Sequence, residues 1–225
     1  MSFADRILQF ITGLNLPVAL PPGIEVMNPF RDMLTLEICN EFYQKFYPDD
    51  HLRWMIVGIN PGRFGGGVTG IPFTDPIRLQ NECGILNPWQ KKQELSSLFV
   101  YEVINAFGGP RAFYQKFYIT AISPLGFTKN EKNLNYYDDR SLQESIRDFV
   151  IDCVNRQLQF GIHRNAVFCL GDGKNYKYLS ALNKEKKIFE AVIPLSHPRF
   201  IMQYRLKRKA HYIQYYLDQF SLYAT

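Results

Sequence analysis

One glycine-rich stretch dominates the sequence, and it runs Gly58-Ile59-Asn60-Pro61-Gly62-Arg63-Phe64-Gly65-Gly66-Gly67-Val68-Thr69-Gly70-Ile71-Pro72-Phe73. It follows Arg53-Trp54-Met55-Ile56-Val57, an apolar run typical of a buried strand. Proline lacks a donor N–H and glycine permits positive φ, so the chain must turn sharply after this strand. In open parallel α/β sheets, ligands bind at the carboxyl ends of the strands. The sequence therefore predicts that Asn60 projects into a ligand site from a tight turn.

The composition indicates one globular domain that spans residues 1–225. The chain has 225 residues, of which 46% are hydrophobic and 15% aromatic, and this length is enough for one sizeable core. The net charge of +5 permits a nucleic-acid partner but is equally typical of an ordinary soluble protein. Charge alone therefore does not choose between these two classes.

The cysteines give no sign of a metal or redox centre. The four of them are scattered without a C-x-x-C pair, so we expect no zinc, no iron–sulfur cluster and no other cofactor. The sequence has no signal peptide and no long apolar segment, which makes a reducing cytoplasm the expected location and excludes a membrane partner. We expect the protein to be a monomer.

The order of the predicted elements indicates an α/β fold. Apolar runs predict strands at 53–57, 117–122, 165–170 and 188–193. Helical patterns lie between them, at 2–14, 31–46, 94–107, 111–116, 138–160, 174–183 and 202–221, with polar irregular segments at 76–91 and 127–137. Strands that alternate with helices favour a three-layer α/β/α architecture around a largely parallel four-stranded sheet.

Parallel topology has a consequence for the site. Unusual segments follow each of the four predicted strands, namely Asn60-Pro61-Gly62, Ser123-Pro124, Gly171-Asp172-Gly173 and His197-Pro198. The carboxyl ends of parallel strands share one edge of the sheet, so these four segments should meet in one cleft.

The run 58–73 resembles the first motif of the uracil-DNA glycosylase superfamily, in the form typical of its single-strand-selective monofunctional branch. A bare Asn-Pro-Gly would be an ordinary turn. The full sixteen-residue run is more specific, since the family pattern is Gly-Met-Asn-Pro-Gly-Pro-Phe-Gly, a short gap, and Thr-Gly-Val-Pro-Phe. This chain has Ile59 in place of Met and Arg63 in place of Pro, and it keeps the spacing without a gap.

A second motif supports the resemblance. Leu195-Ser196-His197-Pro198 is similar to the second motif of the superfamily, whose commoner form is His-Pro-Ser-Pro, with Arg199 and Phe200 in place of Ser-Pro. A lone histidine is most often a surface or core residue. His197 follows the last predicted strand and lies opposite Asn60 in the expected cleft, which favours a functional role for it.

The resemblance implies hydrolysis of the N-glycosidic bond to uracil, by a monofunctional DNA glycosylase of base excision repair that flips the base out of DNA. Asn60 would hold a water near the sugar, and His197 would stabilise the departing anion. Phe73 would stack on the base. The other expected pocket residues are Gly58, Ile59, Pro61, Gly62, Phe64 and Ser123. No motif lysine is placed to form a Schiff base, so we expect no strand cleavage, and 5-hydroxymethyluracil is a further candidate substrate.

One departure from the family concerns recognition of the base. The strand before the Pro-Leu step carries, in the family, an asparagine that reads the edge of uracil, and this chain has Ala121 there. Either another group reads the base, with Thr120, Ser123 and Asn135 as candidates, or the pocket is less strictly a uracil pocket. In the second case hypoxanthine or xanthine becomes an alternative substrate.

The segment after the second motif is the expected DNA-binding surface. Arg199, Phe200 and Ile201 would supply a wedge that fills the gap left by the flipped base. Arg205, Lys207 and Arg208 form a basic cluster able to meet phosphates, although a solvated helix face explains such a cluster equally well.

Two other functions stay open on the sequence alone. A non-catalytic nucleic-acid-binding protein on the same fold would account for Ala121 and Arg63. A nucleotide or sugar enzyme on a flavodoxin-like sheet would use Gly171-Asp172-Gly173 near a phosphate, but this short motif is explained as well by a turn.

Overall fold

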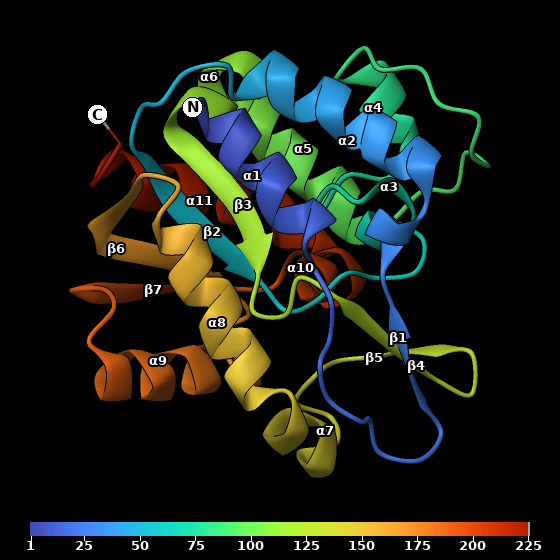
Figure 1. Ribbon diagram of the computed structural model, residues 1–225. Coiled ribbons are helices and arrows are strands. Elements are labelled where there is room, and N and C mark those ends of the chain that lie inside the picture. The colour runs from blue at the N-terminus through green and yellow to red at the C-terminus, as the bar shows by residue number, and fades with distance from the viewer. Residues whose placement is uncertain (225) are drawn as a thin grey trace.

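A four-stranded parallel sheet forms the centre of the protein in the computed structural model, which describes residues 1–224 (Figure 1). Its strands, in the spatial order β3-β2-β6-β7, are β3 (Phe117–Ala121), β2 (Arg53–Gly58), β6 (Ile162–Leu170) and β7 (Ala191–Leu195). All three pairings are parallel. This sheet confirms the α/β fold expected from the sequence.

Aromatic side chains fix helices to both faces of the sheet. Neighbouring residues of a strand point to opposite faces. Tyr118 therefore packs with Phe3 of α1 and with Phe160, which follows α8. Phe117, one position earlier, packs with Phe113 of α6 and Phe220 of α11 on the other face. Helices thus flank the sheet on both sides, as Figure 1 shows.

The helices differ from the expected ones in their breaks and in two short unexpected helices, Gly66–Thr69 and Pro76–Asn81, of which the second lies in the segment 76–91 that was expected to be irregular. The helices are α1 (Phe3–Thr12), α2 (Met33–Phe46), α3 (Gly66–Thr69), α4 (Pro76–Asn81), α5 (Leu95–Phe107), α6 (Gly109–Lys116), α7 (Arg140–Ser145), α8 (Arg147–Leu158), α9 (Lys174–Lys186), α10 (Pro198–Tyr204) and α11 (Lys209–Ser221), with short 3₁₀ turns at Pro29–Arg31 and Leu206–Arg208. None of these helices is both long enough and apolar enough to span a membrane.

The single helix expected over 138–160 is wrong, because Ile146 leaves helical geometry (φ −94°, ψ 2°) and its side chain is fully buried. The helix expected over 202–221 is also interrupted, at Arg205 (φ −133°), whose side chain is exposed. The last strand also begins and ends later than the expected 188–193.

A second sheet lies where the sequence predicted a polar loop. It is antiparallel, in the order β1 (Ile24–Met27), β4 (Gly126–Lys129) and β5 (Lys132–Leu134). Asn130 and Glu131 connect β4 to β5 with φ of 50° and 57°, the geometry of a tight two-residue hairpin turn. Such turns usually have glycine at the second position. This chain has Glu131 there, so the sequence did not predict the hairpin.

The small sheet packs directly on the glycine-rich stretch. A Cβ atom at Gly126 would lie 2.7 Å from the Pro61 carbonyl oxygen, so only glycine fits at this position of β4. Asn133 of β5 accepts a hydrogen bond from the Arg63 backbone N–H at 3.1 Å. The small sheet therefore supports the turn that follows β2.

We expect Phe168→Ala to destabilise the fold by about 3–5 kcal/mol, since a buried phenylalanine replaced by alanine leaves a cavity. Phe168 is fully buried in β6, with its ring against those of Phe117 and Phe220. Urea unfolding would measure the loss. Leu86→Ala is the control, because Leu86 is 81% exposed. Equal stabilities of the two variants would contradict this account of the core.

Candidate active site

Three of the four unusual segments meet in one pocket at the edge of the parallel sheet, and the fourth, Gly171-Asp172-Gly173, lies beside His197 but outside the pocket lining. Asn60, Pro124 and His197 line one pocket, and a Cβ at Gly171 would lie 3.8 Å from the His197 ring. The helices α1 and α2 close the pocket with apolar side chains. Its lining residues are Phe10, Ile11, Phe30, Tyr43, Ile59, Asn60, Pro61, Gly62, Gly66, Gly70, Pro72, Phe73, Glu94, Ser96, Tyr118, Thr120, Ala121, Pro124, Asn133, Asn135, His197 and Arg199.

Asn60 is held in one orientation by backbone groups. Its Nδ2 donates to the Leu134 carbonyl at 3.2 Å, and its Oδ1 accepts from the Tyr136 backbone N–H at 3.0 Å. Both partners lie in the segment that leaves the small sheet. A carbonyl oxygen has two lone pairs, so Asn60 Oδ1 can still accept one hydrogen bond from a molecule in the pocket.

His197 is a neutral imidazole at ordinary pH. It caps α10, and its Nδ1 accepts from the Arg199 backbone N–H at 3.2 Å, which places the proton of the neutral ring on Nε2. Burial lowers the pKa of His197 to about 4, and the Arg199 charge acts in the same direction, against the opposing effect of Asp172. His197 therefore offers an N–H donor without a positive charge.

Phe73 lies close to the end of β2. A Cβ at Gly58 would come within 2.7 Å of the Phe73 ring, so the ring occupies space that only a glycine leaves free. The Phe73 ring centroid is 6.1 Å from that of His197. The Phe73 backbone has φ of 52°, a left-handed conformation that is strained for a bulky residue and often marks a functional site.

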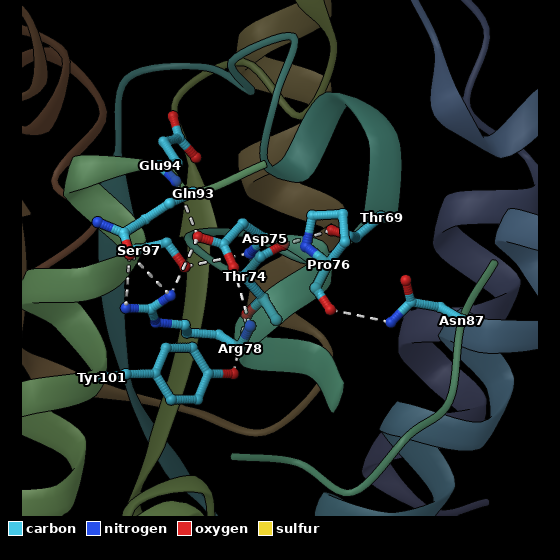
Figure 2. A network of polar contacts seen from close by, with 10 residues as sticks. All are labelled: Thr69, Thr74, Asp75, Pro76, Arg78, Asn87, Gln93, Glu94, Ser97 and Tyr101. Carbon is cyan, nitrogen blue, oxygen red and sulfur yellow. Dashed lines mark hydrogen bonds and ion pairs between the residues drawn. The ribbon is translucent and has the colours of Figure 1, made fainter. Parts of the chain in front are cut away.

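A buried polar network holds the segment that follows Phe73 (Figure 2). Thr69 Oγ1 donates to the Thr74 carbonyl at 2.7 Å. The Asp75 backbone N–H donates to Ser97 Oγ at 3.1 Å, and Asp75 Oδ2 accepts from the Glu94 backbone N–H at 2.9 Å. These bonds tie the strained loop to the start of α5, which explains how the Phe73 conformation is maintained.

Glu94 places a carboxyl group in the pocket wall. Its oxygens occupy the space beside two motif glycines, since a Cβ at Gly62 or Gly65 would lie 2.9 Å or less from them. Burial raises the pKa of Glu94 to about 7, with a further contribution from Asp75 and an opposite one from Arg199. Sequence reasoning missed this residue, because a lone glutamate at the start of a helix carries no signal.

The candidates for reading the base in place of Ala121 each donate a hydrogen bond to another protein group. Ser123 is fully buried outside the pocket lining, and its hydroxyl donates to the Leu125 carbonyl at 2.7 Å, so its placement in the pocket was wrong. Thr120 lines the pocket, but its hydroxyl donates to Gln157 at 2.6 Å. Asn135 lines the pocket and donates its amide N–H to Asp138 at 2.8 Å.

Two further expected pocket residues lie behind or beside the pocket. Gly58 is buried under the Phe73 ring and is absent from the pocket lining. Its lack of a side chain leaves the space that this ring occupies. Phe64 is also outside the lining, and its ring receives the Lys92 ammonium at 3.7 Å and the Arg63 guanidinium at 4.6 Å. Ile59, Pro61 and Gly62 line the pocket as expected.

The segment after His197 contains both exposed and buried side chains. Ile201 is fully buried, so its assignment to DNA contact was wrong: α10 turns it into the core, one position after the exposed Phe200. Arg199 is exposed at the pocket rim, and Arg205 lies over the Phe200 ring at 5.2 Å. Lys207 and Arg208 are exposed, as a phosphate-binding role requires.

The described part of the chain contains no group of three or more His, Cys, Asp or Glu residues that could hold a metal ion. All four cysteines are buried and free. Burial raises the pKa of the Cys169 thiol to about 12, so this thiol is a poor nucleophile or ligand.

A fixed amide, a neutral imidazole and an aromatic ring thus line one pocket at the carboxyl edge of the parallel sheet, where ligands of such folds commonly bind. The chain belongs to the uracil DNA glycosylase superfamily, because the sequence model of that family matches residues 44–220. It is similar to the solved structure of wild-type SMUG2 from Pedobacter heparinus, at 48% sequence identity and a TM-score of 0.97, over 99% of this chain and 98% of that one. No curated protein matches it significantly. The family expected from the two motifs is thus confirmed.

Glu94 should make the stability of the protein depend on pH. Its pKa of about 7 in the folded protein exceeds the ordinary value of 4.5, so the folded state binds more protons between these values and stability falls as pH rises through them. We expect Glu94→Gln to lose less stability than the wild type between pH 5 and 8, as measured by urea unfolding. Glu37→Gln, at an exposed position, is the control and should keep the wild-type slope. A wild-type slope in Glu94→Gln would contradict the raised pKa.

Proposed function

We propose that this protein is a monofunctional DNA glycosylase that flips uracil out of DNA and removes it by hydrolysis. The observation that carries the proposal is the meeting of Asn60, Phe73 and His197 in one pocket at the sheet edge. Membership of the uracil DNA glycosylase superfamily supports it, as does the similarity to a structure described as SMUG2. The proposal names uracil as the preferred base and includes activity on 5-hydroxymethyluracil.

His197 stabilises the leaving base in this mechanism. Breaking the bond between uracil and the sugar leaves a uracil anion, whose oxygen gains negative charge. The Nε2–H of His197 donates to that oxygen, and a donor fixed in advance is effective in a pocket that excludes water. A pKa of about 4 keeps the imidazole neutral, so its contribution is a hydrogen bond and not a proton transfer at neutral pH.

Asn60 positions the nucleophile. The sugar becomes an oxocarbenium-like cation, for which water is a sufficient nucleophile. The free lone pair of Asn60 Oδ1 accepts one hydrogen bond from that water and holds it near the sugar carbon. An amide is not a base, so this role is orientation, and the two bonds to Leu134 and Tyr136 make the orientation rigid.

Phe73 and the exposed segment after His197 bind the DNA. The Phe73 ring offers a face to the flipped base, and base stacking on an aromatic side chain contributes about 1–3 kcal/mol. Arg199 lies at the pocket rim and the next residue, Phe200, is exposed, so this segment could supply a wedge that enters the stack. Arg205, Lys207 and Arg208 would meet phosphates.

The proposal includes six finer properties. The proposed enzyme acts without a cofactor. It also lacks lyase activity, since none of the described residues that line the pocket is a lysine. It is a monomer of one domain, and it works in the cytoplasm on single- or double-stranded DNA.

The experiment that tests the proposal uses labelled oligonucleotides with a single uracil, 5-hydroxymethyluracil, hypoxanthine or xanthine, single- and double-stranded, followed by alkali. Alkali-dependent cleavage at uracil is the expected result. Cleavage without alkali would overturn the monofunctional assignment. Binding without cleavage of any substrate would overturn the enzyme.

We expect Asn60→Ala and His197→Ala each to lower the single-turnover excision rate about 100-fold or more, because each removes a group positioned for the transition state. The fold should survive, as checked by thermal unfolding. Asn40→Ala and His211→Ala change the same residue types at exposed positions and serve as controls. Wild-type rates in both site variants would remove the two assigned roles.

We expect Gly58→Ala to lower excision about tenfold or more, because the added methyl group pushes the Phe73 ring away from its place beside His197. Gly173→Ala is the matched control, since a Cβ there meets no atom within 4 Å. Both variants would be assayed on the same uracil oligonucleotide at saturating enzyme. A wild-type rate for Gly58→Ala would show that the ring can move without consequence.

A further inference from the structure

The segment Gly171-Asp172-Gly173 leads to a buried asparagine that the pocket chemistry does not use. Asn175 lies in the first turn of α9 and is 1% exposed. Its Nδ2 donates to the Leu170 carbonyl at 3.0 Å and to the Gly58 carbonyl at 3.3 Å. Its Oδ1 accepts from the Tyr136 hydroxyl at 2.9 Å. One buried amide thus joins the ends of β6 and β2 to the segment after the small sheet.

Tyr136 contacts Asn60 and Asn175 with different groups. Its backbone N–H donates to Asn60 Oδ1, while its hydroxyl, at the far end of a fully buried side chain, donates to Asn175. Asn175 in turn bonds the carbonyl of Gly58, two residues before Asn60. The bonds therefore form a closed circuit through Asn60, Tyr136, Asn175 and Gly58.

The circuit fixes which way the Asn60 amide faces. If the amide turned over, its NH₂ group would meet the Tyr136 N–H and its oxygen would meet the Leu134 carbonyl, and both contacts would become repulsive. The correct face depends on where the backbone of residues 134–136 lies. That backbone leaves a hairpin whose tip residues are exposed, and the buried Tyr136 side chain anchors it to the main sheet through Asn175.

We propose that Tyr136 and Asn175 are positioning residues for the water held by Asn60: they keep the Tyr136 backbone N–H against Asn60 Oδ1, so that the remaining lone pair of this oxygen points at the reacting sugar. The inference rests on the proposed glycosylase function. It gives the Gly171–Gly173 segment a role, because the turn after β6 brings Asn175 under the glycine-rich stretch. Neither residue touches the substrate.

The test is the variant Tyr136→Phe, which removes the hydroxyl and keeps the ring and the backbone N–H. We expect the single-turnover rate of uracil excision to fall about tenfold, since small misplacements of a reacting group are costly. Affinity for an oligonucleotide with an uncleavable abasic analogue should stay within about twofold. Tyr137→Phe is the matched control: its hydroxyl makes no hydrogen bond among residues 1–224, and we expect a wild-type rate.

A double-mutant comparison separates positioning from a general loss of structure. Tyr136→Phe should have little further effect in an Asn60→Ala background, where no amide is left to orient. It should keep its full effect in a His197→Ala background. Asn175→Ala, which removes the acceptor of the Tyr136 hydroxyl, should likewise have little effect in the Asn60→Ala background and its full effect in the His197→Ala background. All rates are measured well below the unfolding temperature of each variant.

The outcomes distinguish the inference from the function on which it rests. An equal effect of Tyr136→Phe in both backgrounds would mean a structural role only and would overturn the inference. So would a wild-type rate in Tyr136→Phe when Asn60→Ala is impaired. If Asn60→Ala itself excises uracil at the wild-type rate, the proposed role of Asn60 fails and the inference falls with it.

Discussion

The close approach of several groups to the backbone of Gly58 is the constraint on which the site depends. The Phe73 ring occupies the space of a missing Cβ, and the Gly58 carbonyl accepts hydrogen bonds from the Ile122 N–H at 3.0 Å and from Asn175 at 3.3 Å. These contacts bring together segments that lie far apart in the sequence, at the edge where β2, β3 and β6 end. A side chain at position 58 would displace the Phe73 ring, so the placement of this ring in the pocket requires a glycine at the end of β2.

The sequence predicted the parts of the site that follow from topology. The four strands were recognisable as apolar runs, and parallel pairing then required Asn60 and His197 to meet. The sequence did not predict the direction in which individual side chains point. Phe200 and Ile201 are neighbours in sequence, yet α10 exposes one and buries the other, and no periodicity could be read from so short a segment. Ser123 similarly turns inward to satisfy the Leu125 carbonyl.

The supporting structure around Asn60 was hidden for a different reason. The β4–β5 hairpin turns on Asn130 and Glu131, and the strands are short and carry charged or polar residues, so nothing distinguished them from a loop. Yet this small sheet delivers the Leu134 carbonyl and the Tyr136 N–H to Asn60. Nearly every residue type can make a backbone hydrogen bond, so such bonds cannot be read from the amino-acid sequence. Sequence motifs therefore identify the groups that act but not the groups that orient them.

The proposed chemistry explains why so many contacts hold the side chains of the candidate site in place. Asn60 carries no charge, and a pKa of about 4 leaves His197 uncharged as well, so neither can rely on a strong base or a full positive charge. Such groups help only when their dipoles are fixed toward the charge that develops, because a mobile dipole must first be reoriented at a cost in free energy. The strained Phe73 backbone, the buried network around Asp75 and the bonds to Asn60 all serve this end. In the proposed mechanism, rigidity replaces the acid or base strength that Asn60 and His197 lack.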